Sequence, residues 1–187
     1  MLRLTVILIE AMTSRTFFLL LTVVLATLGW GQTKLVLDIE NRGKVEIELY
    51  TNEAPKTTAQ IIRLAQSGFY NGQKFFRVVK SPKPFLIQTG DPASKTKPAN
   101  DPGLGSGGSG KSVPYEDSGH SNVEGAVGLS ALPRDKNSGD SQFYILLGPA
   151  KFLDGSYTVF GRVVSGMDVV RAVELGDKVT SATIVRG

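Results

Sequence analysis

The sequence predicts a mainly β protein, a closed antiparallel barrel capped by two helices. Three observations lead to this prediction: many short segments have strand-like patterns, two separated stretches have helical spacing, and no repeat or linker divides the chain. Many short strands with isolated helices are typical of such a barrel. With 187 residues, 41% of them hydrophobic, the chain has room for one well-cored domain.

A β-hairpin is predicted first. Residues 34–40 (KLVLDIE) and 44–50 (KVEIELY) each alternate apolar and polar residues, and residues 41–43 (NRG) supply the turn between them. Alternation over this length indicates strands with one buried face, so the apolar side chains of both segments should point inward.

The rest of the chain is expected to supply two helices and six further strands. One helix should run from Pro55, which suits a first helical turn, to Gly68, which can end it, and a second should lie around residues 167–175. The strands are expected at residues 75–79, 85–89, 126–131, 142–147, 158–164 and 180–185. Residues 91 to about 121 are rich in Gly, Ser, Pro and Asn, which predicts a long loop of the kind that is often functional.

Residues 1–31 are interpreted as a targeting segment that precedes a domain of residues 32–187. Residues 17–30 (FFLLLTVVLATLGW) carry no charge and follow Arg15, which are the proportions of a signal peptide. A membrane-spanning helix usually needs about 20 apolar residues, so this run is short for an anchor. We expect cleavage after Gly31 and export to the periplasm or the medium. The alternatives are an uncleaved membrane anchor and a buried core helix, and Met12 is an alternative start.

Composition excludes much conventional enzyme chemistry. The chain has no cysteine, which removes disulfides, thiolate nucleophiles and cysteine metal sites. Its single histidine, His120, would have to serve any hydrolase triad, and we interpret it as a solvated loop residue. The adjacent acids Glu116 and Asp117 are interpreted in the same way. The formal charge of +4 is spread along the chain, so a nucleic-acid partner is not expected.

One stretch matches a nucleotide-binding motif letter for letter. Gly105, Gly110, Lys111 and Ser112 fit the pattern G-x-x-x-x-G-K-S, which cradles phosphates when a strand precedes it and a helix follows it. Prolines lie close to the stretch on both sides, which fits neither requirement. We therefore interpret it as a glycine-rich loop and expect no nucleotide.

Three segments together resemble the cyclophilin-type peptidyl-prolyl isomerases in a bacterial-like form. They are residues 75–77 (FFR) with 85–91 (FLIQTGD), residues 141–145 (SQFYI), and residues 152–155 (FLDG) running to 159–161 (VFG). The resemblance covers residues 34 to about 185. It implies an eight-stranded barrel with a helix over each end, and rotation about X–Pro bonds without a covalent intermediate, metal or cofactor. The implied partners are proline-containing peptides and unfolded or folding proteins, with the chain as a monomer and a membrane only if the first segment stays uncleaved.

The same resemblance implies roles for individual residues. Arg77 should stabilise the twisted amide by donating a hydrogen bond to the prolyl nitrogen, and Gln88 should orient the substrate backbone. The residues implied to hold the proline ring or to line the rest of the pocket are Phe85, Leu86, Ser130, Tyr144, Phe152, Leu153 and Tyr157.

The sequence departs from the family at several positions. Phe76, Tyr144, Phe152 and Tyr157 stand where histidine, phenylalanine, tryptophan and histidine are usual, and because all four are aromatic the pocket should survive. Loss of the tryptophan predicts weak cyclosporin binding. Arg77 and Phe85 lie eight positions apart, a longer spacing than is usual in the family, so residues 80–84 should bulge outward. This insertion favours the alternative function, a non-catalytic module that binds proline peptides as a chaperone.

Overall fold

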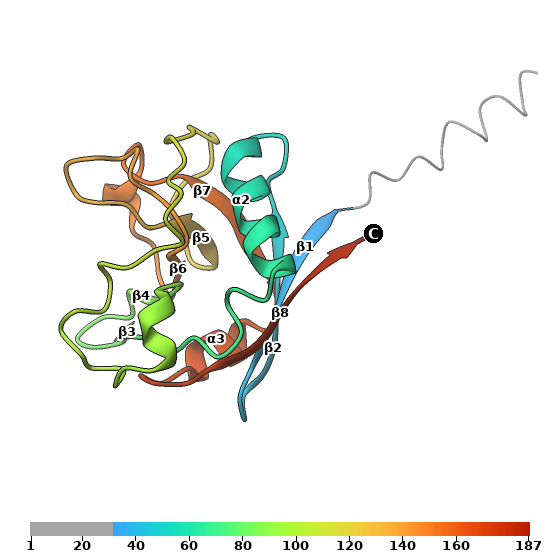
Figure 1. Ribbon diagram of the computed structural model, residues 1–187. Coiled ribbons are helices and arrows are strands. Elements are labelled where there is room, and N and C mark those ends of the chain that lie inside the picture. The colour runs from blue at the N-terminus through green and yellow to red at the C-terminus, as the bar shows by residue number, and fades with distance from the viewer. Residues whose placement is uncertain (1–31) are drawn as a thin grey trace, which may run out of the picture. The chain divides into compact units, whose positions relative to one another are not determined.

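The computed structural model describes residues 32–187 (Figure 1). These residues form an antiparallel sheet of eight strands that is curled on itself. The strands are β1 (Thr33–Ile39), β2 (Gly43–Leu49), β3 (Arg77–Val79), β4 (Leu86–Thr89), β5 (Ala126–Leu129), β6 (Phe143–Leu146), β7 (Val159–Ser165) and β8 (Val179–Arg186). Their order in the sheet is β3-β4-β6-β5-β7-β2-β1-β8. The predicted fold class, mainly β with eight antiparallel strands and two helices, is confirmed.

The N-terminal hairpin forms as the alternation of its residues predicts. In the pairing of β1 with β2, Leu35 lies opposite Ile47, and both side chains are fully buried. The turn requires a positive φ at Asn41 (60°) and at Gly43 (122°), which asparagine and glycine adopt more readily than other residues. The turn predicted at residues 41–43 therefore forms because Asn41 and Gly43 adopt the positive φ angles that it requires.

Two α-helices pack on the sheet. α2 (Pro55–Gln66) begins with proline in its first turn, as predicted, and buries Ile61, Leu64 and Ala65 in the main core. α3 (Met167–Ala172) is shorter than the predicted helix of residues 167–175, because the backbone of Val173 turns to φ −57° and ψ 133°, outside the helical region. In Figure 1 the two helices lie at different places along the curled sheet.

The N-terminus of α2 is capped by a side chain from the long loop. The carboxylate of Glu116 accepts hydrogen bonds from the N–H groups of Lys56 (3.0 Å) and Thr57 (2.8 Å) and from the Thr57 hydroxyl (2.8 Å). A carboxylate at this position also complements the positive end of the helix dipole. The interpretation of Glu116 as a solvated loop residue is therefore wrong, because it is half-buried and bonded to the helix.

The three strands β4, β5 and β6 are buried on both faces. On the inner face Ile87, Val127 and Ile145 belong to the main core. The alternate residues point to the outer face, where a second apolar cluster forms. Because successive side chains of a strand point to opposite faces, a strand buried on both faces carries two separate apolar surfaces.

The barrel closes along a seam, which we define as residues 72–75 and 176–179, rather than by pairing of β3 with β8. An isolated bridge joins Lys74 to Lys178. Backbone bonds from Phe75 N–H to Asp177 O (2.9 Å) and from Val179 N–H to Gln73 O (2.8 Å) flank this bridge. Residues 75 and 76, predicted as part of a strand, precede β3, which therefore has only three residues.

The glycine-rich loop is stabilised by the chain's own carboxylates. The N–H groups of Gly105 (2.8 Å) and Gly107 (3.0 Å) donate to Oδ2 of Asp91, and the N–H groups of Gly110 (2.8 Å) and Lys111 (3.2 Å) donate to Oδ2 of Asp140. No strand directly precedes this stretch and no helix directly follows it. The backbone donors that a phosphate would require are thus already occupied.

Two short 3-10 helices, η2 (Pro92–Lys95) and η3 (Lys151–Leu153), were not predicted from the sequence. Within residues 32–187 no helix is both long enough and apolar enough to span a membrane. The predicted targeting segment, residues 1–31, lies outside the described residues.

Candidate functional site

An apolar surface on the outer face of β4, β5 and β6 brings most of the predicted substrate-binding residues together. We call it the outer cluster; its buried members are Leu86, Ala126, Tyr144, Leu146, Ala150 and Val159, and its partly exposed members are Tyr50, Phe85, Leu153 and Tyr157. Phe152, from η3, is 75% exposed at its edge, with its ring centroid 5.8 Å from that of Phe85. Five of the seven predicted pocket residues therefore belong to one surface, with Phe152 at its edge.

Tyr144 forms the floor of the outer cluster. Its ring lies over Gly128 on the neighbouring strand β5, where a β-carbon would overlap the ring and hydroxyl atoms. The hydroxyl donates to Oδ1 of Asn122 (2.6 Å), and the ring of Tyr157 meets that of Tyr144 edge-on at 5.9 Å. Burial raises the pKa of Tyr144 well above its usual value, so the phenol stays protonated and remains a hydrogen-bond donor.

Asn122 connects the floor to the wall of the outer cluster. Its backbone N–H (2.7 Å) and its side-chain Nδ2 (2.8 Å) both donate to Oδ1 of Asp154, the residue that follows Leu153. These hydrogen bonds, the backbone bond foremost, hold the pKa of Asp154 below its usual value. Sequence reasoning missed Asn122, because a single asparagine in a long polar loop gives no signal of burial.

Arg77 lies at the rim of the outer cluster. It is the first residue of β3 and pairs with Gln88 of β4; its Nη1 donates to Oε1 of Gln88 (3.3 Å), and its Cζ lies 5.9 Å from the ring centroid of Phe85. Residues 81–84 are exposed, and a backbone bond from Phe85 N–H to Val79 O (2.9 Å) closes the hairpin ahead of them. The longer connection therefore leaves the pairing of β3 with β4 intact.

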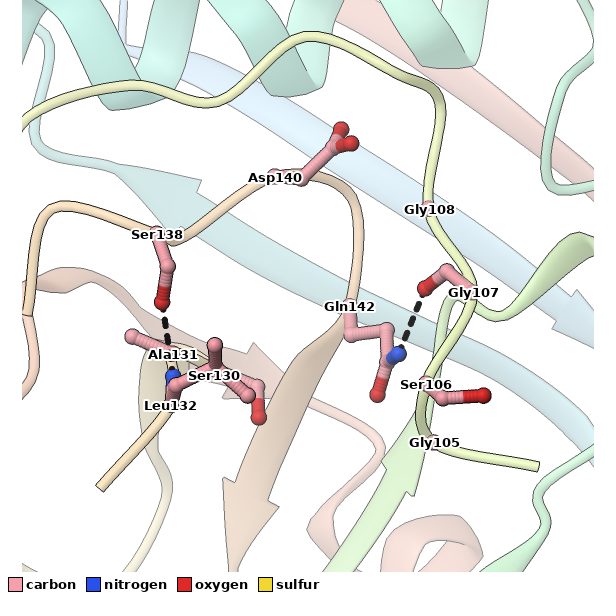
Figure 2. A pocket seen from close by; sticks show the side chains of 10 residues that line it. All are labelled: Gly105, Ser106, Gly107, Gly108, Ser130, Ala131, Leu132, Ser138, Asp140 and Gln142. Atoms are coloured by element: carbon pink, nitrogen blue, oxygen red, sulfur yellow. Dashed lines mark hydrogen bonds between the residues drawn. The ribbon is translucent and has the colours of Figure 1, made fainter. Parts of the chain in front are cut away.

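The side chain of Gln88 is held in one orientation by several partners. It is 6% exposed, and its Nε2 donates to Oε1 of Gln142 (3.0 Å) and to the hydroxyl of Ser130 (3.2 Å). Gln142, which lies in the segment 141–145 but was assigned no role from the sequence, donates in turn to the carbonyl of Gly107 (2.7 Å), as Figure 2 shows. A planar amide bonded at both ends cannot rotate freely, so the Gln88 carbonyl is directed at the guanidinium.

A cleft of about 250 Å³ adjoins this network (Figure 2). Ser130 lies in the cleft rather than in the outer cluster, beside Gln142 and opposite the glycine-rich loop. The cleft is lined by residues 105–108, Ser130, Ala131, Leu132, Ser138, Asp140 and Gln142. The predicted site is thus divided into an apolar surface and a more polar cleft, with Gln88 between them.

His120 adjoins the outer cluster through the ring of Tyr50. It is exposed, and its ring stacks on that of Tyr50 with the centroids 3.8 Å apart. Within residues 32–187 no hydrogen bond joins its ring nitrogens to a serine hydroxyl, and no group of three His, Cys, Asp or Glu residues could hold a metal ion. The geometry gives no support to a hydrolase.

The sequence of the chain is similar to those of known peptidyl-prolyl cis-trans isomerases. The sequence model described as "Cyclophilin type peptidyl-prolyl cis-trans isomerase/CLD" matches residues 35–186. The chain is 41% identical over 138 residues to the peptidyl-prolyl cis-trans isomerase ppi1 of Schizosaccharomyces pombe (71% of this chain, 80% of the relative). It is 38% identical over 168 residues to a probable peptidyl-prolyl cis-trans isomerase of Brucella suis (84% of each chain).

Solved structures agree in fold. A crystal structure of a cyclophilin-type peptidyl-prolyl cis-trans isomerase of Cryptosporidium parvum, determined in the presence of the dipeptide Ala-Pro, matches with a TM-score of 0.66 at 22% identity. The match covers 82% of this chain and 98% of that one. At this identity the likeness concerns the fold.

Proposed function

We propose a mechanism from the premise that this chain belongs to the cyclophilin-type peptidyl-prolyl cis-trans isomerase family. The protein is a peptidyl-prolyl cis-trans isomerase, which accelerates rotation about the X–Pro bond. In the proposed mechanism the outer cluster holds the proline ring while Arg77 stabilises the twisted amide. The observation that carries this proposal is the position of the guanidinium at the rim of an apolar surface, beside Phe85 and Gln88.

The reaction itself explains why a single cation can suffice. Rotation faces a barrier of roughly 18–20 kcal/mol, because twisting the amide breaks its conjugation. As conjugation is lost, the prolyl nitrogen regains a lone pair that can accept a hydrogen bond. A donor placed at that nitrogen stabilises the twisted state more than the planar one, which is the requirement for catalysis. Arginine suits this role because it stays protonated throughout the physiological pH range.

The remaining residues of the site hold the substrate. The outer cluster offers a partly exposed apolar surface to the proline ring, including Phe85 and Leu153. Gln88, fixed by Gln142 and Ser130, presents an amide to the substrate backbone. With the ring held on one side of the bond, rotation turns the preceding carbonyl, and the chain attached to it, relative to the ring.

The ligands that we propose are proline-containing segments of unfolded or folding proteins. The relative from Cryptosporidium parvum was crystallised in the presence of the dipeptide Ala-Pro, which is the smallest member of this class.

We also propose that the protein is exported. The uncharged run of residues 17–30, preceded by Arg15, supports a signal peptide. N-terminal sequencing of the protein recovered from the envelope or the medium should then begin at Gln32, and a sequence that begins at Met1 or Met12 would contradict cleavage.

Exchange NMR of a short Ala-Pro peptide tests the mechanism. The wild-type protein should accelerate cis-trans exchange, and Arg77→Ala should reduce kcat/KM by about 100- to 1,000-fold, the usual cost of removing a preorganised donor. Arg134→Ala, which removes an exposed arginine that belongs neither to the outer cluster nor to the lining of the cleft, is the matched control and should retain full activity. Circular dichroism should show both variants folded. Retention of activity in Arg77→Ala would refute the role of the guanidinium, and peptide binding by the wild type without accelerated exchange would indicate the non-catalytic module.

A further inference from the structure

A basic groove lies between α2 and the loop that follows Ser109, outside the site described above. Three cationic side chains stand along it: Lys56 and Arg63 on α2, and Lys111 on the facing loop. Its volume, about 370 Å³, exceeds that of the cleft beside Gln88. Ala59, Val113 and Pro114 contribute an apolar lining between the cations. No acidic or aromatic residue lines the groove.

The side chains of the three cations of the groove form no salt bridge within residues 32–187. All three are exposed, whereas seven other Lys and Arg side chains in that part of the chain form ion pairs. Arg63 is oriented by a hydrogen bond from its Nη2 to Oε1 of Gln60 (3.0 Å). Lys56 and Arg63 lie on the same face of α2, about 10 Å apart along its axis. The charge is therefore distributed along the groove and does not converge on one point.

The backbone around the groove argues against a phosphate ligand. A phosphate site normally combines cations with free backbone N–H groups. Here the N–H groups of residues 56 and 57 donate to Glu116, and those of Gly110 and Lys111 donate to Asp140. Because no aromatic residue lines the groove, there is also no platform on which a nucleobase can stack. Spaced cations over an apolar lining suit an extended chain that carries several carboxylates.

We propose that the basic groove binds acidic segments of polypeptide. The strap of residues 109–111 runs from Gly108, which lines the cleft, to Lys111, which lines the groove. Gln60 holds this strap through bonds from its Nε2 to the carbonyl of Lys111 (2.9 Å) and the hydroxyl of Ser109 (3.2 Å). In Figure 2 the chain beyond Gly108 passes between the cleft and a helix. A client held by its acidic segment would thus have its prolines concentrated near the isomerase site. The binding itself does not depend on the proposed role of Arg77.

Fluorescence anisotropy of a labelled peptide tests this proposal. The probe is a proline-free peptide of glutamate alternating with glycine and serine, titrated with the full-length protein at low ionic strength. Lys56→Glu/Arg63→Glu should weaken binding by at least about tenfold, because attraction becomes repulsion at both positions. The matched control is Lys44→Glu/Lys95→Glu, which makes the same change in net charge at exposed lysines that do not line the groove, and it should change affinity by less than about twofold. Added salt should weaken the wild-type complex.

Further measurements separate the groove from its alternatives. Lys111→Glu, on the opposite wall, should also weaken binding, whereas exchange of a neutral Ala-Pro peptide should be unchanged in every groove variant. The proposal is overturned if the wild type does not bind the peptide, or if the groove and control variants lose affinity equally. Unlabelled acidic peptide, a single-stranded oligonucleotide and inorganic phosphate are compared as competitors, with each concentration expressed in moles of negative charge. The proposal is also overturned if the oligonucleotide or phosphate displaces the labelled peptide at a lower concentration than the unlabelled peptide does.

Discussion

The two faces of β4, β5 and β6 are both apolar, yet they differ in what covers them. On the inner face, Ile87, Val127 and Ile145 are completely enclosed by other side chains of the main core. On the outer face the covering residues, such as Phe85 and Leu153, are themselves partly exposed. The inner face is therefore a packing surface, and the outer face is an apolar surface that a ligand can complete.

Side-chain size distinguishes the two faces of β5. Its inward residues are Val127 and Leu129, whereas its outward residues are Ala126 and Gly128. The small outward residues leave the room that the ring of Tyr144 occupies. The comparison shows that burial alone does not distinguish a core from a binding surface, whereas residue size and the degree of enclosure do.

The largest effect on stability should come from the inner face. Phe143 is fully buried, with its ring edge-on to Tyr70 (5.5 Å) and Phe160 (6.2 Å). Phe143→Ala should lower the free energy of unfolding by about 3–5 kcal/mol in urea denaturation, through lost burial and the cavity left behind. Phe152→Ala, which truncates a phenylalanine that is 75% exposed, should change it by less than about 0.5 kcal/mol. Equal losses for both variants would break the comparison.

An added methyl group on the outer face should affect the site more than the fold. In Gly128→Ala the new β-carbon overlaps the ring of Tyr144, so the floor of the outer cluster must shift. We expect a loss of about 1–3 kcal/mol of stability from overpacking and a KM for an Ala-Pro peptide raised several-fold. Val127→Ala, the neighbouring change on the inner face, should also lower stability but leave KM unchanged. A raised KM in Val127→Ala would show that the two faces are not independent.

Removal of one hydroxyl should sharpen the comparison further. Tyr144→Phe deletes the 2.6 Å bond to Asn122 and leaves the buried Oδ1 of that asparagine without its donor. We expect a loss of about 1–2 kcal/mol in thermal or urea unfolding. Because the apolar ring remains in place, kcat/KM should change by less than about twofold. A large fall in kcat/KM with no loss of stability would instead place the hydroxyl in contact with the substrate.

The smallest effect should appear as a dependence of stability on pH. The pKa of Asp154 is lowered in the folded protein, mainly by hydrogen bonds from Asn122. Its ionised form therefore stabilises the fold above the unfolded-state pKa, near 3.8, and this contribution is lost as the pH falls through the lower folded-state pKa. Asp154→Asn should lower Tm at neutral pH, and the difference from the wild type should shrink below about pH 4. A difference that stays constant from pH 7 to pH 3 would contradict this assignment.

Local patterns predicted the parts of the fold that depend on local interactions. The hairpin of β1 and β2 follows from alternation and from the turn residues Asn41 and Gly43, and the start of α2 follows from Pro55. By contrast, the seam depends on residues about 100 positions apart, and no periodicity within residues 72–75 indicates their partners. The strand β3 is accordingly shorter than the sequence predicted.

The candidate site shows the same division. The resemblance selected Arg77, Gln88 and half of the residues of the outer cluster, because these residues lie in segments that resemble the family. Asn122 and Gln142 connect these residues through hydrogen bonds. The sequence assigned neither of them a role in the site, because that role depends on burial and on partners distant in sequence. A polar side chain gives the same signal in a sequence whether it is solvated or bonded within the protein.

The seam has a consequence for how the two halves of the site are held. The strands behind the outer cluster have a hydrogen-bonded neighbour strand on each side. By contrast, β3, which carries Arg77, is paired with β4 alone, and the seam that joins this edge to β8 involves the residues before β3. Amide hydrogen exchange should therefore be faster across residues 72–79 than across β6. In the proposed mechanism, strands with two hydrogen-bonded neighbours therefore hold the proline ring, whereas the arginine at the turning amide lies on an edge strand with one.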